Sequence, residues 1–136
     1  MAGRRMAGCT PADARSRLQQ AKAFLETADL VLSDDTDTAT PGVAAALAVL
    51  AGIAATDAAC CAKLGRRSRA QDHAEATSLL RTVAPHGEAM AKDLARLLAA
   101  KDESHYGVTI VGRAKARRLL GYARRLFELA ERVLAG

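Results

Sequence analysis

The sequence predicts an all-α protein, an antiparallel bundle of four to five helices joined by short loops. Its 136 residues include 32 alanines, and alanine has the highest helix propensity of all residues. The chain has only 2 Phe, 2 Tyr and no Trp, so the aromatic residues that favour strands are scarce. Its apolar residues recur at steps of three and four, which is the period of one helix face.

The first two helices are predicted over Pro11 to Leu32 and from Pro41 to Leu64. Each has a threonine as a natural N-cap, directly before a proline that suits the first helical position. The first helix carries an apolar stripe at Leu18, Ala21, Leu25, Ala28 and Leu32. An acidic linker over 33–40 separates the two helices, and Gly65 is the expected stop of the second.

A third helix is predicted to begin near Ser68, which forms a capping box pattern with Gln71. The run Pro85-His86-Gly87 breaks it, and a fourth helix then extends toward Tyr106. The β-branched run 108–111 is too short and isolated for a sheet, so we expect an ordered connection. No strand is predicted anywhere in the chain.

The fifth helix, about Gly112 to Leu134, has the most regular apolar face and a strongly basic opposite face. Its basic residues are Arg113, Lys115, Arg117, Arg118, Arg124, Arg125 and Arg132. With two glutamates, this helix accounts for the formal net charge of +5 of the whole chain. Because we find no aromatic residues interleaved with these cations, the simplest interpretation is a solvated face.

The alanine-rich core gains little free energy per residue, since a buried methyl or methylene contributes only about 0.8 kcal/mol. Close approach of the helices and a partner surface would compensate, so we expect a homodimer. Residues 1–9 are predicted to be a flexible segment ahead of one domain over 10–136. The apolar stretch 43–62 contains Asp57, which favours a buried bundle helix over a membrane span.

The cysteines are Cys9, Cys60 and Cys61, an odd number with two of them adjacent. This spacing does not indicate a disulfide framework or a zinc site. We expect Cys60 and Cys61 to be small, buried, free thiols. Free thiols and the absence of a secretory signal pattern at the start of the chain favour the cytoplasm. No metal and no cofactor are predicted.

Lys101, His105 and Tyr106 form the first candidate site. Steps of three and four carry the apolar stripe of the fourth helix on to Lys101 and then to His105. A lysine can hold a phosphate, and a histidine can transfer protons near neutral pH, so the set suits phosphodiester cleavage. The alternative is a helix end where charged residues return to solvent and Tyr106 packs inward.

A second cluster, Arg66, Arg67, Arg69 and His73, lies where the third helix is expected to begin. Helix N-termini attract anions, so these residues could bind phosphate or RNA; the simpler interpretation is a solvated basic loop in which His73 forms local hydrogen bonds. Asp57 is a lone carboxylate in an apolar helix, and burial requires that it be paired. Arg67, Lys101 or His105 could pair with it; alternatively, Asp57 only faces a polar seam.

Three stretches resemble the HEPN (higher eukaryotes and prokaryotes nucleotide-binding) superfamily. They are Ala54-Ala-Thr-Asp57-Ala in the apolar helix, Gly65-Arg-Arg-Ser-Arg-Ala-Gln-Asp-His73, and Leu94-Ala-Arg-Leu-Leu-Ala-Ala-Lys-Asp-Glu-Ser-His-Tyr106 before the final helix. The resemblance spans about Thr10 to Leu134. It implies a compact helical bundle, usually dimeric, and active members that are metal-independent endoribonucleases, often toxins or defence effectors.

The family's catalytic motif is Arg, four to six residues, then His, and two copies meet at the dimer interface. Here Lys101 stands in place of Arg with three residues before His105, whereas Arg67 to His73 has the right spacing at a different helix. Many members without the motif act in binding or scaffolding, and some partner nucleotidyltransferases.

The sequence therefore predicts a non-catalytic role in binding RNA or a nucleotide, with a nucleotidyltransferase or an antitoxin as a possible partner. The first alternative is a metal-independent endoribonuclease that uses Lys101, His105 and Tyr106. The second is an unrelated structural or partner-binding bundle.

Overall fold

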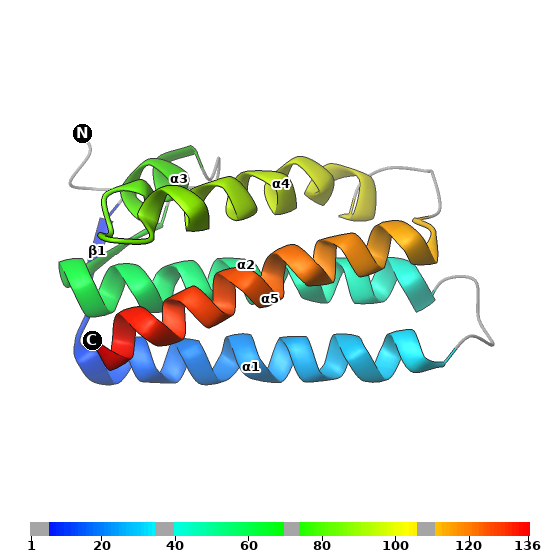
Figure 1. Ribbon diagram of the computed structural model, residues 1–136, viewed down its shortest axis with the longest axis horizontal. Coiled ribbons are helices and arrows are strands. Elements are labelled where there is room, and N and C mark those ends of the chain that lie inside the picture. Colours follow the sequence, from blue (N-terminus) through cyan, green and yellow to red (C-terminus); the bar gives the residue numbers. More distant parts are fainter. Residues whose placement is uncertain (1–5, 35–39, 70–73, 106–110) are drawn as a thin grey trace.

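Five helices and a two-stranded sheet make up the computed structural model, which describes residues 6–34, 40–69, 74–105 and 111–136. In chain order the elements are β1 (Met6–Gly8), α1 (Pro11–Ser33), α2 (Thr40–Leu64), β2 (Arg66–Ser68), α3 (Ala74–Arg81), α4 (Gly87–His105) and α5 (Arg113–Ala135). The predicted all-α bundle is confirmed. Figure 1 shows α1, α2 and α5 running along the long axis of the molecule, with α3 and α4 forming a layer above α2.

The first helix begins as the sequence predicts. The backbone N–H of Asp13 donates to the Thr10 hydroxyl at 3.1 Å, and the Thr10 N–H donates to the Asp13 carboxylate at 2.9 Å. These two bonds form a capping box that satisfies donors at the helix start. The second helix ends at Leu64, and Gly65 follows with a φ of 69°, a backbone conformation that favours glycine.

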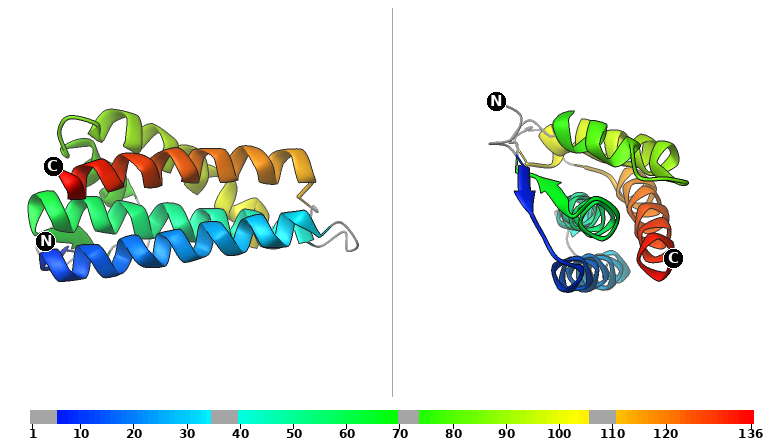
Figure 2. Two further views of the ribbon diagram at one scale, coloured as in Figure 1. Left: turned by 60° about the horizontal axis from the view of Figure 1, so that its bottom comes forward. Right: turned by 90° about the vertical axis from the view of Figure 1, so that its left-hand side faces the viewer.

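The central helix of the bundle is α2, which packs against α1, α4 and α5. The end-on view in Figure 2 shows α2 between α1 and the α3–α4 layer. Eight of its fifteen buried residues are alanines, and all eight are fully buried. Larger side chains from the surrounding helices fill the core, among them Leu80, Met90, Leu94, Leu97 and Leu126.

Within the described residues, α2 is the helix that is long and apolar enough to cross a membrane. However, 72% of its most apolar window is buried inside the bundle. That burial is compatible with the core helix of a soluble protein.

The region between α2 and α3 corrects two predictions. Ser68 lies in β2 (Arg66–Ser68) and not at a helix start, while the described part of α3 is Ala74–Arg81 and Gln71 lies outside the described residues. Strand β2 pairs antiparallel with β1, with Ala7 opposite Arg67. Residues 6–9 therefore belong to the fold, whereas the sequence analysis set them aside as flexible. A strand of three residues is too short to produce a recognisable alternation of polar and apolar residues.

The disulfide Cys9–Cys61 corrects the prediction that Cys61 is a free thiol. Only Cys60 is free among the three cysteines, and it is buried as expected. The backbone N–H of Cys9 also donates to the Gly65 carbonyl at 3.0 Å, so β1 is attached to the end of α2 twice. With Cys9 and Cys61 bridged, the cytoplasmic localisation stays a prediction without the support of free thiols.

The last helix agrees with its prediction to within a residue at each end. Gly112 is the N-cap of α5, and Ala116, Leu119, Leu120, Ala123, Leu126 and Ala130 are its buried residues. The predicted connection before it falls largely on residues 106–110, which lie outside the described residues.

Candidate functional site: a cationic cavity around Asp57

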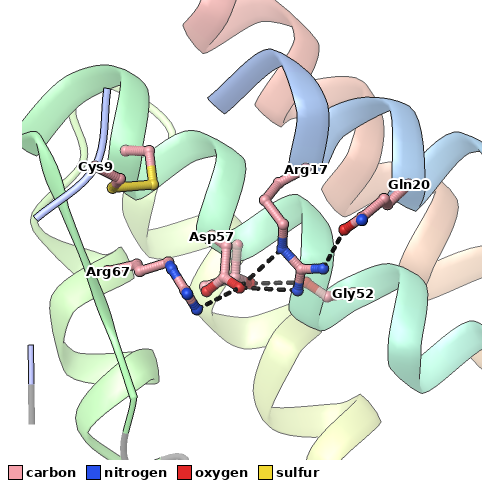
Figure 3. A network of polar contacts seen from close by, with 8 residues as sticks. Cys9, Arg17, Gln20, Gly52, Asp57 and Arg67 are labelled. Atoms are coloured by element: carbon pink, nitrogen blue, oxygen red, sulfur yellow. Dashed lines mark hydrogen bonds and ion pairs between the residues drawn. A yellow bond between two sulfur atoms is a disulfide. The ribbon is translucent and has the colours of Figure 1, made fainter. Parts of the chain in front are cut away.

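Asp57 lies near the C-terminal end of α2 and is only 7% exposed. A buried carboxylate requires charged or hydrogen-bonding partners. The Arg17 guanidinium of α1 donates to Asp57 Oδ2 through Nε at 3.1 Å and Nη2 at 2.8 Å. Arg67 of β2 places Nη1 at 3.6 Å from the same oxygen, so two arginines from distant parts of the chain converge on one carboxylate (Figure 3).

Local structure explains how each arginine reaches Asp57. Arg17 stands between the buried Ala14 and Ala21 on the face of α1 that packs against α2. It also donates to the Gln20 side chain one turn further along α1. Arg67 directly follows the turn at Gly65, in the middle of a strand held by its pairing with β1. Figure 3 shows the two guanidinium groups approaching Asp57 from opposite sides.

The disulfide Cys9–Cys61 restrains the elements that carry Asp57 and Arg67. Cys61 follows Asp57 by one helical turn, and its bond to Cys9 ties β1 to α2. Because β1 pairs with β2, the covalent link restrains the strand that carries Arg67. The bridge therefore helps to set the distance between Arg67 and Asp57.

A cavity of about 300 Å³ opens beside this network, between α1, α2, β2, α3 and α4. Cationic, polar and apolar side chains all line it. The cations are Arg17, Arg67, Arg69 and Lys101, the other polar residues are Thr56, Asp57 and Ser68, and the apolar residues are Ile53, Ala76, Leu94 and Leu98. Among the lining residues that the structure describes, four carry a positive charge and one carries a negative charge at neutral pH, so this part of the wall is cationic.

The two remaining polar groups on α2 and β2 have different roles. Thr56 donates its hydroxyl to the Gly52 carbonyl at 2.9 Å, so that hydrogen bond stays within α2. Ser68 is a half-buried residue of β2, and it lines the cavity together with its chain neighbours Arg67 and Arg69. The cavity thus combines an apolar floor from α2 and α4 with a rim of arginine, lysine and serine side chains.

Several predicted site residues meet in this cavity. The cavity is lined by Asp57, Arg67, Arg69 and Lys101. In the sequence, Arg67 and Arg69 belong to one candidate cluster, Lys101 to another, and Asp57 is a separate candidate. Of the three partners proposed for Asp57, Arg67 forms an ion pair with it, and Lys101 lines the same cavity. Arg66 is different: it is exposed in β2 and does not line the cavity.

The candidate histidines cannot be placed in the same way. His105 is the last residue of α4, but its side chain lies outside the described part of the chain. His73 and Tyr106 are not among the described residues. Within the residues that the structure describes, no three His, Cys, Asp or Glu side chains come together in a way that could hold a metal ion.

Sequence reasoning missed Arg17, although a signal was present. Arg17 stands four residues before Ala21, so it continues the buried stripe of the first helix toward its start. A cation on an apolar face indicates a buried acidic partner, and Asp57 is that partner.

Cys60, next to the bridged Cys61, faces the core rather than the cavity. The pKa of its thiol is raised to about 12, mainly by burial and then by the negative charge of Asp57, while the charge of Arg66 acts in the opposite direction. Its thiolate is the form that would react as a nucleophile, and the raised pKa makes that form rare at neutral pH.

Asp93 on α4 is a second buried carboxylate, 4% exposed, that the sequence analysis did not select. It accepts from Arg125 Nη2 of α5 at 2.9 Å and from Arg96 Nη1 of its own helix at 3.3 Å. The hydrogen bond to Asp93 raises the pKa of Arg125, so this guanidinium remains charged. Asp93 stands three residues after Met90 and four before Leu97, on the apolar stripe of the helix.

Comparison with known proteins found no match for this chain among family models, curated proteins or solved structures.

Proposed function

We propose that this chain is a HEPN-like helical bundle that binds a phosphate-bearing ligand, a nucleotide or RNA, in the cavity around Asp57. The observation that supports the proposal is the convergence of Arg17, Arg67, Arg69 and Lys101 on one cavity, where Asp57 is the one carboxylate among the described lining residues. Arginine donors in a fixed fork match the oxygens of a phosphate, and lysine adds a compact positive charge.

The role of Asp57 in this proposal is to position the arginines. Its carboxylate forms ion pairs with Arg17 and Arg67. The side chains of these two arginines are only 29% and 39% exposed. Guanidinium groups fixed in this way lose little conformational freedom when a ligand binds. The described lining side chains carry four positive charges and one negative charge, which supports an anionic ligand in the cavity.

The apolar floor supports a ligand that has more than a phosphate. Ile53, Leu94 and Leu98 offer a surface to a base or a sugar, while the cations on the rim hold its phosphate. A volume of about 300 Å³ is at the lower end of the range for pockets that hold small organic ligands. A mononucleotide, or one nucleotide of an RNA chain, is therefore the ligand class that we propose.

Binding measurements with two ligands test this proposal and separate its two sources of phosphate. We expect ADP to bind in calorimetry if the ligand is a free nucleotide, and a 12-nucleotide single-stranded RNA to bind in fluorescence anisotropy if the ligand is RNA. Arg67→Gln and Lys101→Met should each weaken binding about tenfold, because each removes one charge from the cavity. The matched control is Arg132→Gln, which removes an exposed charge outside it.

Absence of binding by the wild-type protein to both ligands would contradict the proposal and favour the unrelated partner-binding bundle. Equal weakening by Arg132→Gln would also contradict it, because the attraction would then come from net charge alone.

The endoribonuclease alternative has one observation in its favour: Lys101 lines the same cavity as Arg67. Incubation of the wild-type protein with labelled RNA in EDTA tests it, with Lys101→Ala and His105→Ala alongside. Cleavage that both substitutions abolish would establish a metal-independent nuclease. Intact RNA that is nevertheless bound would support the non-catalytic proposal.

A further inference from the structure

A second cationic site lies on the other side of α4, in a groove between α4 and α5. Its cavity of about 350 Å³ is lined by Arg96, Ala99, Ala100, Lys115, Arg118, Leu119 and Tyr122. Three of these side chains are cations, and none of the lining residues that the structure describes is a carboxylate. The alanines of α4 leave room between the helices, and the larger residues of α5 form the wall.

Tyr122 changes the interpretation of the basic face of α5. The sequence analysis found no aromatic residue among its cations, but the Tyr122 ring lies among them in the folded protein. The guanidinium carbons of Arg96 and Arg125 lie 5.2 Å and 5.4 Å from the centre of this ring. Both distances are within the range of a cation–π interaction. Arg96 comes from α4, so only the packing of the two helices brings it to the ring.

Asp93 restrains the two arginines that contact the Tyr122 ring. The buried carboxylate holds both Arg96 and Arg125, the two arginines that lie against Tyr122. These arginines are about half exposed, at 52% and 56% of their side chains, so they also face solvent. The groove therefore presents guanidinium groups and an aromatic ring whose positions are restrained by one carboxylate.

The spacing along α5 places the other cations in line with the ring. Lys115, Arg118 and Tyr122 follow each other at steps of three and four, so they share one face of the helix. A chain that lies along the groove would meet positive charges first and the aromatic ring one to two turns later. Single-stranded RNA has this alternation of charged phosphates and planar bases, and proteins bind it through cations and stacking side chains.

We propose that the groove between α4 and α5 binds single-stranded RNA, with Arg118 and Lys115 on the phosphates and Tyr122 with Arg96 stacking on a base. An acidic peptide would use the cations but would bring no planar base to stack on the Tyr122 ring or on the Arg96 guanidinium beside it. The inference rests on this groove alone and does not require the cavity around Asp57 to bind anything.

Anisotropy with a fluorescein-labelled 12-nucleotide oligouridine tests the proposal. Lys115→Glu/Arg118→Glu should weaken binding at least tenfold. The matched control, Arg117→Glu/Arg132→Glu, makes the same change of formal net charge on exposed residues of the same helix outside the groove. It should weaken binding less than threefold.

Tyr122 supplies the readout that separates RNA from other polyanions. Tyr122→Leu should weaken RNA binding at least fivefold, while Tyr122→Phe, which keeps the ring and its packing, should bind as the wild type does. Neither should alter the binding of a labelled polyglutamate peptide. Circular dichroism establishes that each variant retains its helices, and the comparison of Lys115→Glu/Arg118→Glu with its control keeps the proposal testable if Tyr122→Leu unfolds.

Three results would overturn the proposal: no RNA binding by the wild-type protein, equal weakening by the groove and control variants, or polyglutamate binding as tight as that of RNA. Failure of the first proposal is distinguishable. ADP binding that is lost in Arg67→Gln reports on the cavity around Asp57, whereas oligouridine binding that is lost in Lys115→Glu/Arg118→Glu reports on the groove.

Discussion

Asp57 and Asp93 are both buried carboxylates held by two arginines, but they obtain these partners in different ways. Asp57 is contacted by Arg17 of α1 and Arg67 of β2, neither of which belongs to its own helix. Asp93 is contacted by Arg96, three residues further along α4, and by Arg125 of the neighbouring α5. The first network therefore depends on the packing of three elements and the second on a single pair of helices.

The arginines of the two networks also differ in how much of their side chains is exposed to solvent. Those at Asp57 are 29% and 39% exposed, whereas those at Asp93 are 52% and 56% exposed. Water can hydrate the Asp93 pair if the carboxylate is lost, but it hydrates the Asp57 pair less well. The comparison teaches that the cavity around Asp57 is costly to perturb, while the groove beside Asp93 is a surface feature that tolerates change.

The largest expected effect comes from the disulfide, which supports only the Asp57 region. Its two cysteines are 52 residues apart, and closing a loop of that length stabilises a protein by about 4 kcal/mol in the chain-entropy treatment. We expect Cys9→Ser to lower the free energy of unfolding by about this amount, measured with urea. Ligand binding at the cavity should weaken, and oligouridine binding at the groove should not.

Reduction of the wild-type protein with dithiothreitol is the matched condition. It should reproduce the loss and leave Cys9→Ser unchanged, because that variant has no bridge to reduce. A wild-type protein whose unfolding is insensitive to dithiothreitol would contradict the role assigned to the bridge.

Truncation of the two carboxylates tests the comparison itself. Asp57→Ala leaves two partly buried guanidinium groups without their partner, and we expect a loss of about 3 kcal/mol in the free energy of unfolding. Asp93→Ala leaves more exposed arginines, so its loss should be about 1 kcal/mol. Urea titration of both variants side by side measures the difference, and equal losses would show that the two networks do not differ as described.

The thiol of Cys60 gives a pH dependence with a definite sign. Its pKa is raised to about 12 in the folded protein, from an ordinary value of 9.0, first by burial and then by the charge of Asp57. Above pH 9 the unfolded chain loses this proton while the folded protein keeps it, so stability falls as the pH rises toward 12. Between pH 9 and 10 the free energy of unfolding should drop by about 1 kcal/mol.

The Cys60→Ala variant provides the control, because it has no thiol at this position to titrate. The difference in stability between the wild type and this variant should therefore change by about 1 kcal/mol over the same interval. A constant difference would mean that the thiol titrates alike in the folded and unfolded protein.

The smallest expected effect belongs to an exposed ion pair whose hydrogen bonds are as short as those of the buried pairs. Arg124 donates to both oxygens of Asp29 at 2.8 and 3.0 Å, but these side chains are 46% and 56% exposed. Arg124→Ala should lower the free energy of unfolding by about 0.5 kcal/mol. A loss as large as that of Asp57→Ala in the same titration would show that burial does not determine the strength of these pairs.

The helices were predictable because their signals are local. Thr10 with Pro11 marks the start of α1, Gly65 marks the end of α2, and Pro85 with Gly87 separates α3 from α4. Each signal acts through hydrogen bonds or backbone angles within a few residues.

The errors share the opposite property. Cys61 bonds to Cys9 across 52 residues, and β2 exists because β1 pairs with it across most of the first half of the chain. Neither partner can be identified from a window of local sequence. Ser68 shows the consequence, since its helix-capping pattern is overridden by strand pairing.

The candidate site was predictable only in part, because residue types are visible in the sequence but contacts between distant residues are not. The residue types of Asp57, Arg67, Arg69 and Lys101 attracted attention individually, but the sequence could not show that they line one cavity. Arg17 and Tyr122 were missed because their significance comes from helix packing. Arg17 meets Asp57 across α1 and α2, and Tyr122 meets Arg96 across α4 and α5.

The central claim is that the cationic cavity around Asp57 binds phosphate, and an NMR titration of the full chain with inorganic pyrophosphate tests it most directly. We predict that the backbone amides of 56–57, 66–69 and 94–101 shift first and saturate together, and that Arg67→Gln abolishes these shifts. Saturable shifts confined to other parts of the bundle, or none at millimolar pyrophosphate, would contradict the account.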